Sequence, residues 1–85
     1  MDFGQTFLYQ QKACQIYRRL YGEIHPQVAY AYTTLATYHH SAGAFESGFE
    51  LLWRSLYILR QTVGEDHPDV AAIYINLGQC YSEVD

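Results

Sequence analysis

The chain has 85 residues, enough for one small domain with a modest hydrophobic core. Nearly half of the residues are apolar and nine are tyrosines, and this composition excludes a disordered tail. The formal net charge of -4 argues against a dedicated nucleic-acid module, because such modules carry a strong basic excess.

The start of the chain lacks both the basic residues and the apolar run of a signal peptide, and polar residues interrupt every apolar stretch before it could span a membrane. Cys14 and Cys80 are isolated and belong to no CxxC pair. Together these features predict a cytoplasmic protein with reduced thiols and no membrane insertion.

The periodicity of the apolar residues predicts four helices. The first covers residues 3–21, where apolar side chains recur at helical spacing. Gly22 tolerates the left-handed conformation that commonly ends a helix. Pro26 suits the first turn of the next helix, because its missing N–H would be unpaired there. The other helices are predicted over residues 26–41, 44–63 and 68–85. No stretch shows the alternation of a half-buried strand, so we predict an all-α fold.

The sequence of the link between the first two helices recurs later in the chain. Gly-Glu-Ile-His-Pro at residues 22–26 corresponds to Gly-Glu-Asp-His-Pro at residues 64–68, which is 42 residues later. With this offset, 12 of the 43 overlaid positions are identical. A fixed period of about 20–50 residues indicates stacked structural repeats, whose usual role is to present a binding surface.

Small residues mark the places where helices are expected to cross closely. Gly48 lies inside the predicted third helix, although glycine costs about 1 kcal/mol of helix propensity relative to alanine. Ala36 and Gly78 occupy equivalent positions in the repeat, as do Ala13 and Ser55. We expect these residues at crossing points, since helix axes about 8–10 Å apart leave no room for large side chains.

Residues 35–55 resemble the tetratricopeptide repeat, a helix-turn-helix unit with small and aromatic residues at fixed places. The matching series is Leu35, Ala36, His39, Gly43, Phe45, Gly48, Leu52 and Ser55, and a second copy begins at Leu77, Gly78 and Tyr81. His39 departs from the tyrosine that the family usually has there. The resemblance implies four antiparallel helices in a right-handed superhelical stack, acting as a non-catalytic protein-interaction scaffold.

The 42-residue unit is similar to the repeats of kinesin light chains and, more closely, to those of the clustered-mitochondria family. The closer resemblance lies in residues 10–13, 51–59 and 64–71. It implies a cytoplasmic protein that influences mitochondrial distribution and associates with mRNAs encoding mitochondrial proteins. A cargo adaptor of the kinesin-light-chain type is the alternative, and an RNA-contacting helical surface is a third hypothesis.

The repeat register divides residues 1–85, a single partial repeat domain, into one whole unit and two halves. These are residues 3–21 (second helix of a preceding repeat), 26–63 (complete repeat) and 68–85 (first helix of a following repeat). The last helix then lacks the partner expected to cover Leu77 and Tyr81. We therefore expect a fragment of a longer array, a truncated product, or a piece that self-associates through its uncovered terminal helices.

The family resemblance places a peptide-binding groove along the first helix of each unit. The groove positions are Tyr30, Thr33, Thr34, Thr37, His40 and Ser41, followed by Ala72, Ile75, Asn76, Gln79 and Glu83. Asn76 and Gln79 could hydrogen-bond a peptide backbone, and Tyr30 could supply stacking or apolar contact. The competing interpretation is that these side chains are solvated or touch neighbouring repeats. None is lysine or arginine, which argues against a clamp for a terminal carboxylate and against a groove for acidic cargo peptides.

The basic residues could also contact RNA. Lys12, Arg18, Arg54 and Arg60 occupy equivalent places on two helices, and Trp53 could stack on bases. The competing interpretation is that the arginines pair with Glu23, Glu46 or Glu50.

His25 and His67 each precede a proline and invite a metal hypothesis. A zinc site needs three or four converging ligands, and neither histidine has a cysteine or second histidine within three to five residues. A role in starting the two helices explains both. The sequence also has no nucleophile with a nearby base, no phosphate-binding loop and no metalloprotease motif. We predict no enzymatic activity, cofactor or metal.

Overall fold

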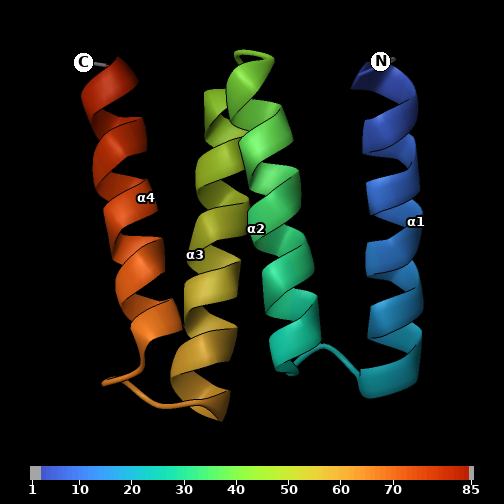
Figure 1. Cartoon of the computed structure of the whole chain (residues 1–85), viewed down its shortest axis with the longest axis vertical. Helices are drawn as coiled ribbons and strands as arrows, with labels where there is room; N and C mark the ends of the chain where they lie inside the picture. The colour runs from blue at the N-terminus through green and yellow to red at the C-terminus, as the bar shows by residue number, and fades with distance from the viewer. Residues whose placement is uncertain (1–2, 85) are drawn as a thin grey trace.

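The computed structural model describes residues 3–84, and the side chains of residues 4–84. Four helices follow one another along the chain: α1 (Phe3–Tyr21), α2 (Pro26–Ser41), α3 (Phe45–Thr62) and α4 (Pro68–Val84). Within residues 3–84 there is no strand, so the predicted all-α fold is confirmed (Figure 1). Each helix lies within one residue of its predicted limits, and residue 85 lies outside the described part of the chain.

The two Gly-Glu-x-His-Pro links act as helix stop and helix start. Gly22 and Gly64 have φ of +84° and +95°, a left-handed conformation that favours glycine. The Nδ1 atom of His25 accepts a hydrogen bond from the backbone N–H of Gln27 at 3.1 Å. The corresponding His67 accepts one from the N–H of Asp69 at 3.0 Å. Both histidines therefore cap a helix N-terminus with a side-chain acceptor, which explains why His-Pro occurs in both copies.

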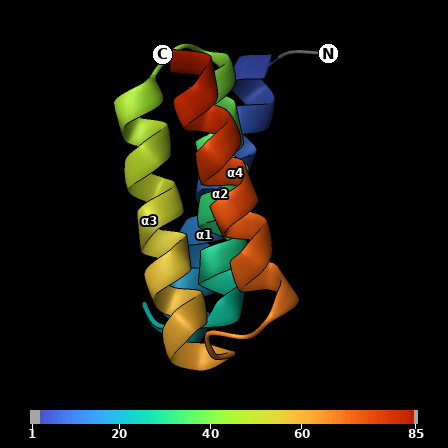
Figure 2. The same ribbon diagram turned by 90° about the vertical axis from the view of Figure 1, so that its left-hand side faces the viewer.

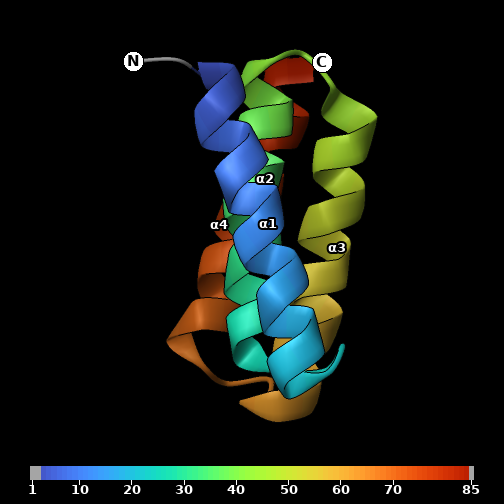
Figure 3. The same ribbon diagram turned by 90° about the vertical axis from the view of Figure 1, so that its right-hand side faces the viewer.

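The helices run antiparallel, and each packs mainly on its neighbour in the chain (Figure 1). Seen from the side, α3 lies beside α2 and α4, which lie one behind the other (Figure 2). From the opposite side α1 lies in front of α2 (Figure 3). The core is shared by all four helices, and its members include Cys14, Val28, Leu35, Leu56, Leu59, Val70 and Leu77.

The closest approach lies between α2 and α3 and confirms the expected role of Gly48. A Cβ atom added to Gly48 would lie 3.3 Å from the carbonyl oxygen of Ala36, which is tighter than an ordinary contact. Further along the same interface Ser55 is fully buried, and its hydroxyl donates to the carbonyl of Ala29 at 2.8 Å. Small residues thus let the two backbones approach.

The uncovered face of α4 differs from the one expected from the sequence. Leu77 is only 4% exposed because this face of α4 packs on α3, so the expectation that it lacks cover is wrong. Tyr81 is half exposed, yet it stacks on Phe49 with ring centroids 4.2 Å apart. The exposed positions of α4 include Ala71, Ile75, Gly78 and Ser82. In the repeat these four positions correspond to Ala29, Thr33, Ala36 and His40, through which α2 contacts α3. Self-association through the uncovered terminal helices stays a prediction.

Candidate protein-binding groove

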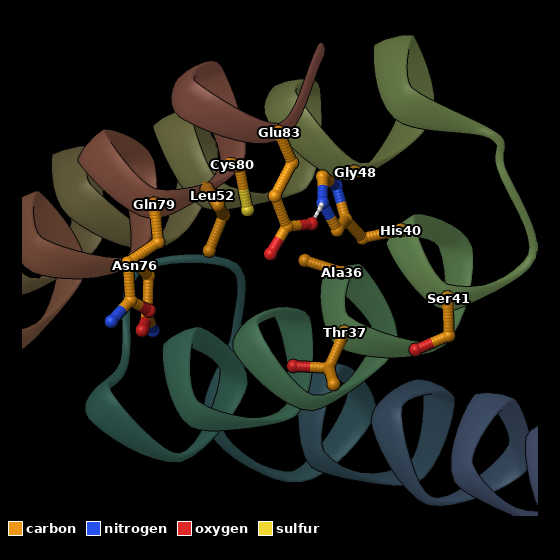
Figure 4. A pocket seen from close by; sticks show the side chains of 10 residues that line it. All are labelled: Ala36, Thr37, His40, Ser41, Gly48, Leu52, Asn76, Gln79, Cys80 and Glu83. Atoms are coloured by element: carbon orange, nitrogen blue, oxygen red, sulfur yellow. Dashed lines mark hydrogen bonds and ion pairs between the residues drawn. The ribbon is translucent and has the colours of Figure 1, made fainter.

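A hollow of about 190 Å³ lies between α2 and α4, with α3 behind it in the view of Figure 4. Of its ten lining residues, six are among the predicted groove positions: Thr37, His40, Ser41, Asn76, Gln79 and Glu83. Ala36 and Cys80 complete the walls, and Gly48 and Leu52 of α3 also line the hollow. The structure therefore brings most of the predicted polar residues together on one cavity.

A second hollow, of about 170 Å³, continues along the same pair of helices. Tyr30, Thr33 and Ala72 line it, and Asn76 lines both hollows. We call the two hollows together the α2–α4 groove. Thr34 and Ile75 line neither hollow, and Ile75 is 61% exposed.

Several residues that line the groove were not predicted as groove positions from the sequence, and Asp69 and Cys80 of α4 are among them. A signal for both was present, because Cys80 lies four residues after Asn76 and three before Glu83, and Asp69 lies seven residues before Asn76, so all four share one face of α4. Burial raises the pKa of the Cys80 thiol, and nearby Glu83 adds to that effect. The raised pKa disfavours the thiolate form, and the side chain packs against the hydrophobic core.

Two side-chain bonds cross the groove from α2 to α4. The hydroxyl of Tyr30 donates to Oδ2 of Asp69 at 2.6 Å. About three helical turns away, Nε2 of His40 contacts Oε2 of Glu83 at 2.5 Å (Figure 4). The hydrogen bond to the Asp69 carboxylate raises the pKa of Tyr30. The two bonds link α2 and α4 at both ends of the groove.

Aromatic rings of α3 hold His40 in place. Its imidazole meets the ring of Phe45 edge to face, with centroids 4.7 Å apart, and lies 6.4 Å from that of Phe49. The side chain of His40 is only 16% exposed. Its orientation toward Glu83 is therefore set by packing as well as by the contact itself.

The groove hydroxyls and carboxamides differ in what they can offer a ligand. Thr33 and Thr37 donate their hydroxyls to carbonyls one turn earlier in α2, at 3.1 and 3.2 Å, and Thr34 does the same at 3.2 Å. Within residues 4–84, no group hydrogen-bonds to the carboxamides of Asn76 and Gln79. These two side chains keep both donor and acceptor capacity.

A comparison with known families agrees with this architecture. A family profile described as tetratricopeptide repeat matches residues 5–27 and 28–69, which together are most of the chain. The chain belongs to the tetratricopeptide repeat family. The second match begins within α2 and continues through α3 into the start of α4. Among curated proteins no relative matches the chain. Tetratricopeptide repeats are non-catalytic scaffolds that typically bind proteins or peptides.

Three of the four arginines of this tetratricopeptide chain pair with carboxylates. Arg18 contacts Glu23 at 2.5 Å, Arg54 contacts Glu50 at 2.8 Å, and Arg60 contacts Glu65. The interpretation that the arginines pair with acidic neighbours is confirmed, although the partner of Arg60 was not among those predicted. Lys12 and Trp53 are exposed. RNA contact through these five predicted residues stays a prediction.

The outer side of the repeat carries a further hollow of about 580 Å³. Ile24, Tyr32, Trp53 and Tyr57 form its apolar walls, and Glu23, Glu50 and Arg54 also line it. It lies between the first link and α3, on the far side of α3 from the groove residues Gly48 and Leu52. Among these residues only Trp53 and Arg54 were candidates from the sequence.

The described residues also bear on metals and membranes. Within residues 3–84 no three histidine, cysteine or carboxylate side chains cluster closely enough to hold a metal ion. No helix of that part of the chain combines the length and apolar character needed to cross a bilayer. Cys14 is buried in the core, and its burial raises the pKa of the thiol.

Proposed function

We propose that this chain is a non-catalytic interaction scaffold that holds an extended segment of a partner protein in the α2–α4 groove. The observation that carries the proposal is the pair of carboxamides, Asn76 and Gln79, which line the α2–α4 groove and have no hydrogen-bond partner among residues 4–84. Each carboxamide can donate to a peptide carbonyl and accept from a peptide N–H. An extended chain offers both groups at every residue, so the groove matches a backbone more closely than a compact ligand.

The experiment is selection of random peptides on the immobilised chain, followed by affinity measurement for the enriched peptides by fluorescence anisotropy. Asn76→Ala and Gln79→Ala together should weaken binding about 10- to 30-fold, since each lost hydrogen bond contributes about 1 kcal/mol. Gln61→Ala, on the exposed side of α3, is the matched control and should leave affinity unchanged. Failure to enrich any peptide, or equal affinity for the double variant, would refute the proposal.

The wider role proposed for the parent protein rests on the sequence resemblance alone. The similarity of residues 51–59 and 64–71 to clustered-mitochondria proteins supports a cytoplasmic protein involved in mitochondrial distribution and in binding mRNAs for mitochondrial proteins. A kinesin-light-chain-type adaptor is the alternative. The open reading frame around these residues distinguishes them: a large mixed domain upstream supports the first, and upstream heptads support the second.

Direct RNA contact is a separate proposal with its own test. The exposed Trp53 and Lys12 favour it, whereas the ion pairs of Arg18, Arg54 and Arg60 reduce the free positive charge. Ultraviolet crosslinking of the chain to RNA in cells should exceed that of an unrelated acidic helical protein. A signal no higher than that control would dismiss the proposal.

A further inference from the structure

The charged side chains of the chain are divided between its helices. All five lysines and arginines lie on α1 and α3. The helices that form the groove, α2 and α4, carry none, while Asp69 and Glu83 place carboxylates at its two ends. A cleft lined by one sign of charge focuses its field and concentrates ions of the opposite sign. The groove therefore favours a cationic over an anionic ligand.

The larger hollow has the size and lining for one long side chain. Its volume of about 190 Å³ equals that of roughly six water molecules at about 30 Å³ each. Ala36, Gly48 and Leu52 give part of it an apolar lining, and the carboxylate of Glu83 stands on its wall (Figure 4). Lysine and arginine combine an aliphatic stem that packs on apolar surface with a charged head that seeks a polar one.

Glu83 retains capacity for a second partner. His40 contacts its Oε2 atom, and the other carboxylate oxygen points into the hollow in Figure 4. A guanidinium group can hydrogen-bond both oxygens of one carboxylate and carries a permanent charge. An arginine from a partner could thus engage the carboxylate more completely than His40 does.

We propose that the hollow lined by Ala36, Leu52, Asn76, Gln79 and Glu83 is a subsite for an arginine or lysine side chain of the bound segment, with Glu83 as its counter-charge. This inference rests on the proposed function of the groove and names the chemical class of its partner as a basic peptide segment. His40 contacts one oxygen of the Glu83 carboxylate, and binding of the basic side chain replaces or supplements that contact.

The test uses single-residue probes, because they report on the subsite without requiring an extended peptide. Acetyl-arginine amide is titrated into the isotope-labelled chain at millimolar concentration, and the side-chain amide signals of Asn76 and Gln79 are followed by NMR. Acetyl-citrulline amide, which has nearly the same shape without the charge, is the matched probe. We expect saturable shifts with the arginine probe and at least tenfold weaker binding of the citrulline probe.

Two variants act in opposite directions. Glu83→Gln keeps the size of the side chain and should abolish the preference for arginine over citrulline. His40→Phe keeps a ring against Phe45 but removes the contact with Glu83, and should tighten arginine binding several-fold. Glu46→Gln removes an exposed carboxylate outside the groove and is the control, expected to bind as the parent chain does.

Equal binding of the two probes, or an undiminished preference in Glu83→Gln, would overturn the inference. The peptide selection described above then separates this failure from that of the groove itself. Enriched peptides without basic residues would leave the scaffold function intact and eliminate the cationic subsite. Absence of any enriched peptide would eliminate the scaffold function instead, whatever the single-residue probes show.

Discussion

Replacing Gly48 with leucine should force α2 and α3 apart at their closest approach. A Cβ atom at this position already lies 3.3 Å from the Ala36 carbonyl oxygen, 3.6 Å from the His40 nitrogen and 3.8 Å from the His40 Cβ. The first of these is a backbone atom and cannot rotate away. The remaining atoms of a leucine side chain have to displace the whole of α2, the helix that carries half of the groove.

Two opposing contributions set the size of the effect. Overpacking of a well-packed site costs typically about 1–3 kcal/mol. Leucine has a higher helix propensity than glycine, and this difference stabilises the folded state by about 1 kcal/mol. We therefore expect Gly48→Leu to lose up to about 2 kcal/mol of unfolding free energy, which corresponds to a fall in Tm of up to roughly 16 °C for a domain of this size.

Gly78 supplies a control in the same chain, because an added Cβ atom there meets nothing within 4 Å. Gly78→Leu gains the same helix propensity without overpacking, so it should be more stable than the parent by up to about 1 kcal/mol. Urea denaturation followed by circular dichroism measures both variants, at concentrations where sedimentation shows monomers. Equal stability changes at Gly48 and Gly78 would refute the helix register and the close-approach argument.

Three further predictions follow from individual contacts. His25→Ala and His67→Ala should each cost about 1 kcal/mol of unfolding free energy through loss of a helix cap, whereas asparagine at either position should restore most of it; thermal melts that show no difference would contradict the capping role. The hydrogen bond from Tyr30 to Asp69 raises the pKa of Tyr30 and stabilises the folded state. This contribution to the unfolding free energy is complete below the ordinary tyrosine pKa of about 10 and is lost as the pH rises through the raised pKa. Tyr30→Phe should therefore flatten the alkaline part of the plot of unfolding free energy against pH. If the exposed face of α4 that carries Ile75 mediates self-association, Ile75→Lys should reduce the increase of the sedimentation coefficient with protein concentration.

Local signals in the chain determine the helices and their ends. A glycine that accepts positive φ marks each link, and a proline that suits a first turn also marks the links before α2 and α4; both act within a few residues of the chain. The 42-residue period then fixes which helices are equivalent, since identical residues fall on identical places of the unit. The crossing residue Gly48 could be identified from its cost in helix propensity, but the same expectation was wrong for Gly78, which lies inside α4 with nothing within 4 Å of an added Cβ atom.

Only the tertiary structure decided which face of each helix is covered by its neighbours. The sequence placed Leu77 on an apolar stripe without showing that the preceding helix, α3, buries it, because packing partners distant along the chain leave no mark in local periodicity. The same holds for the groove. Its residue types could be named in advance, but the bonds from Tyr30 to Asp69 and from His40 to Glu83 join side chains about forty residues apart. Only the stacking of α2 beside α4 brings those groups within hydrogen-bond distance and leaves a cavity between them.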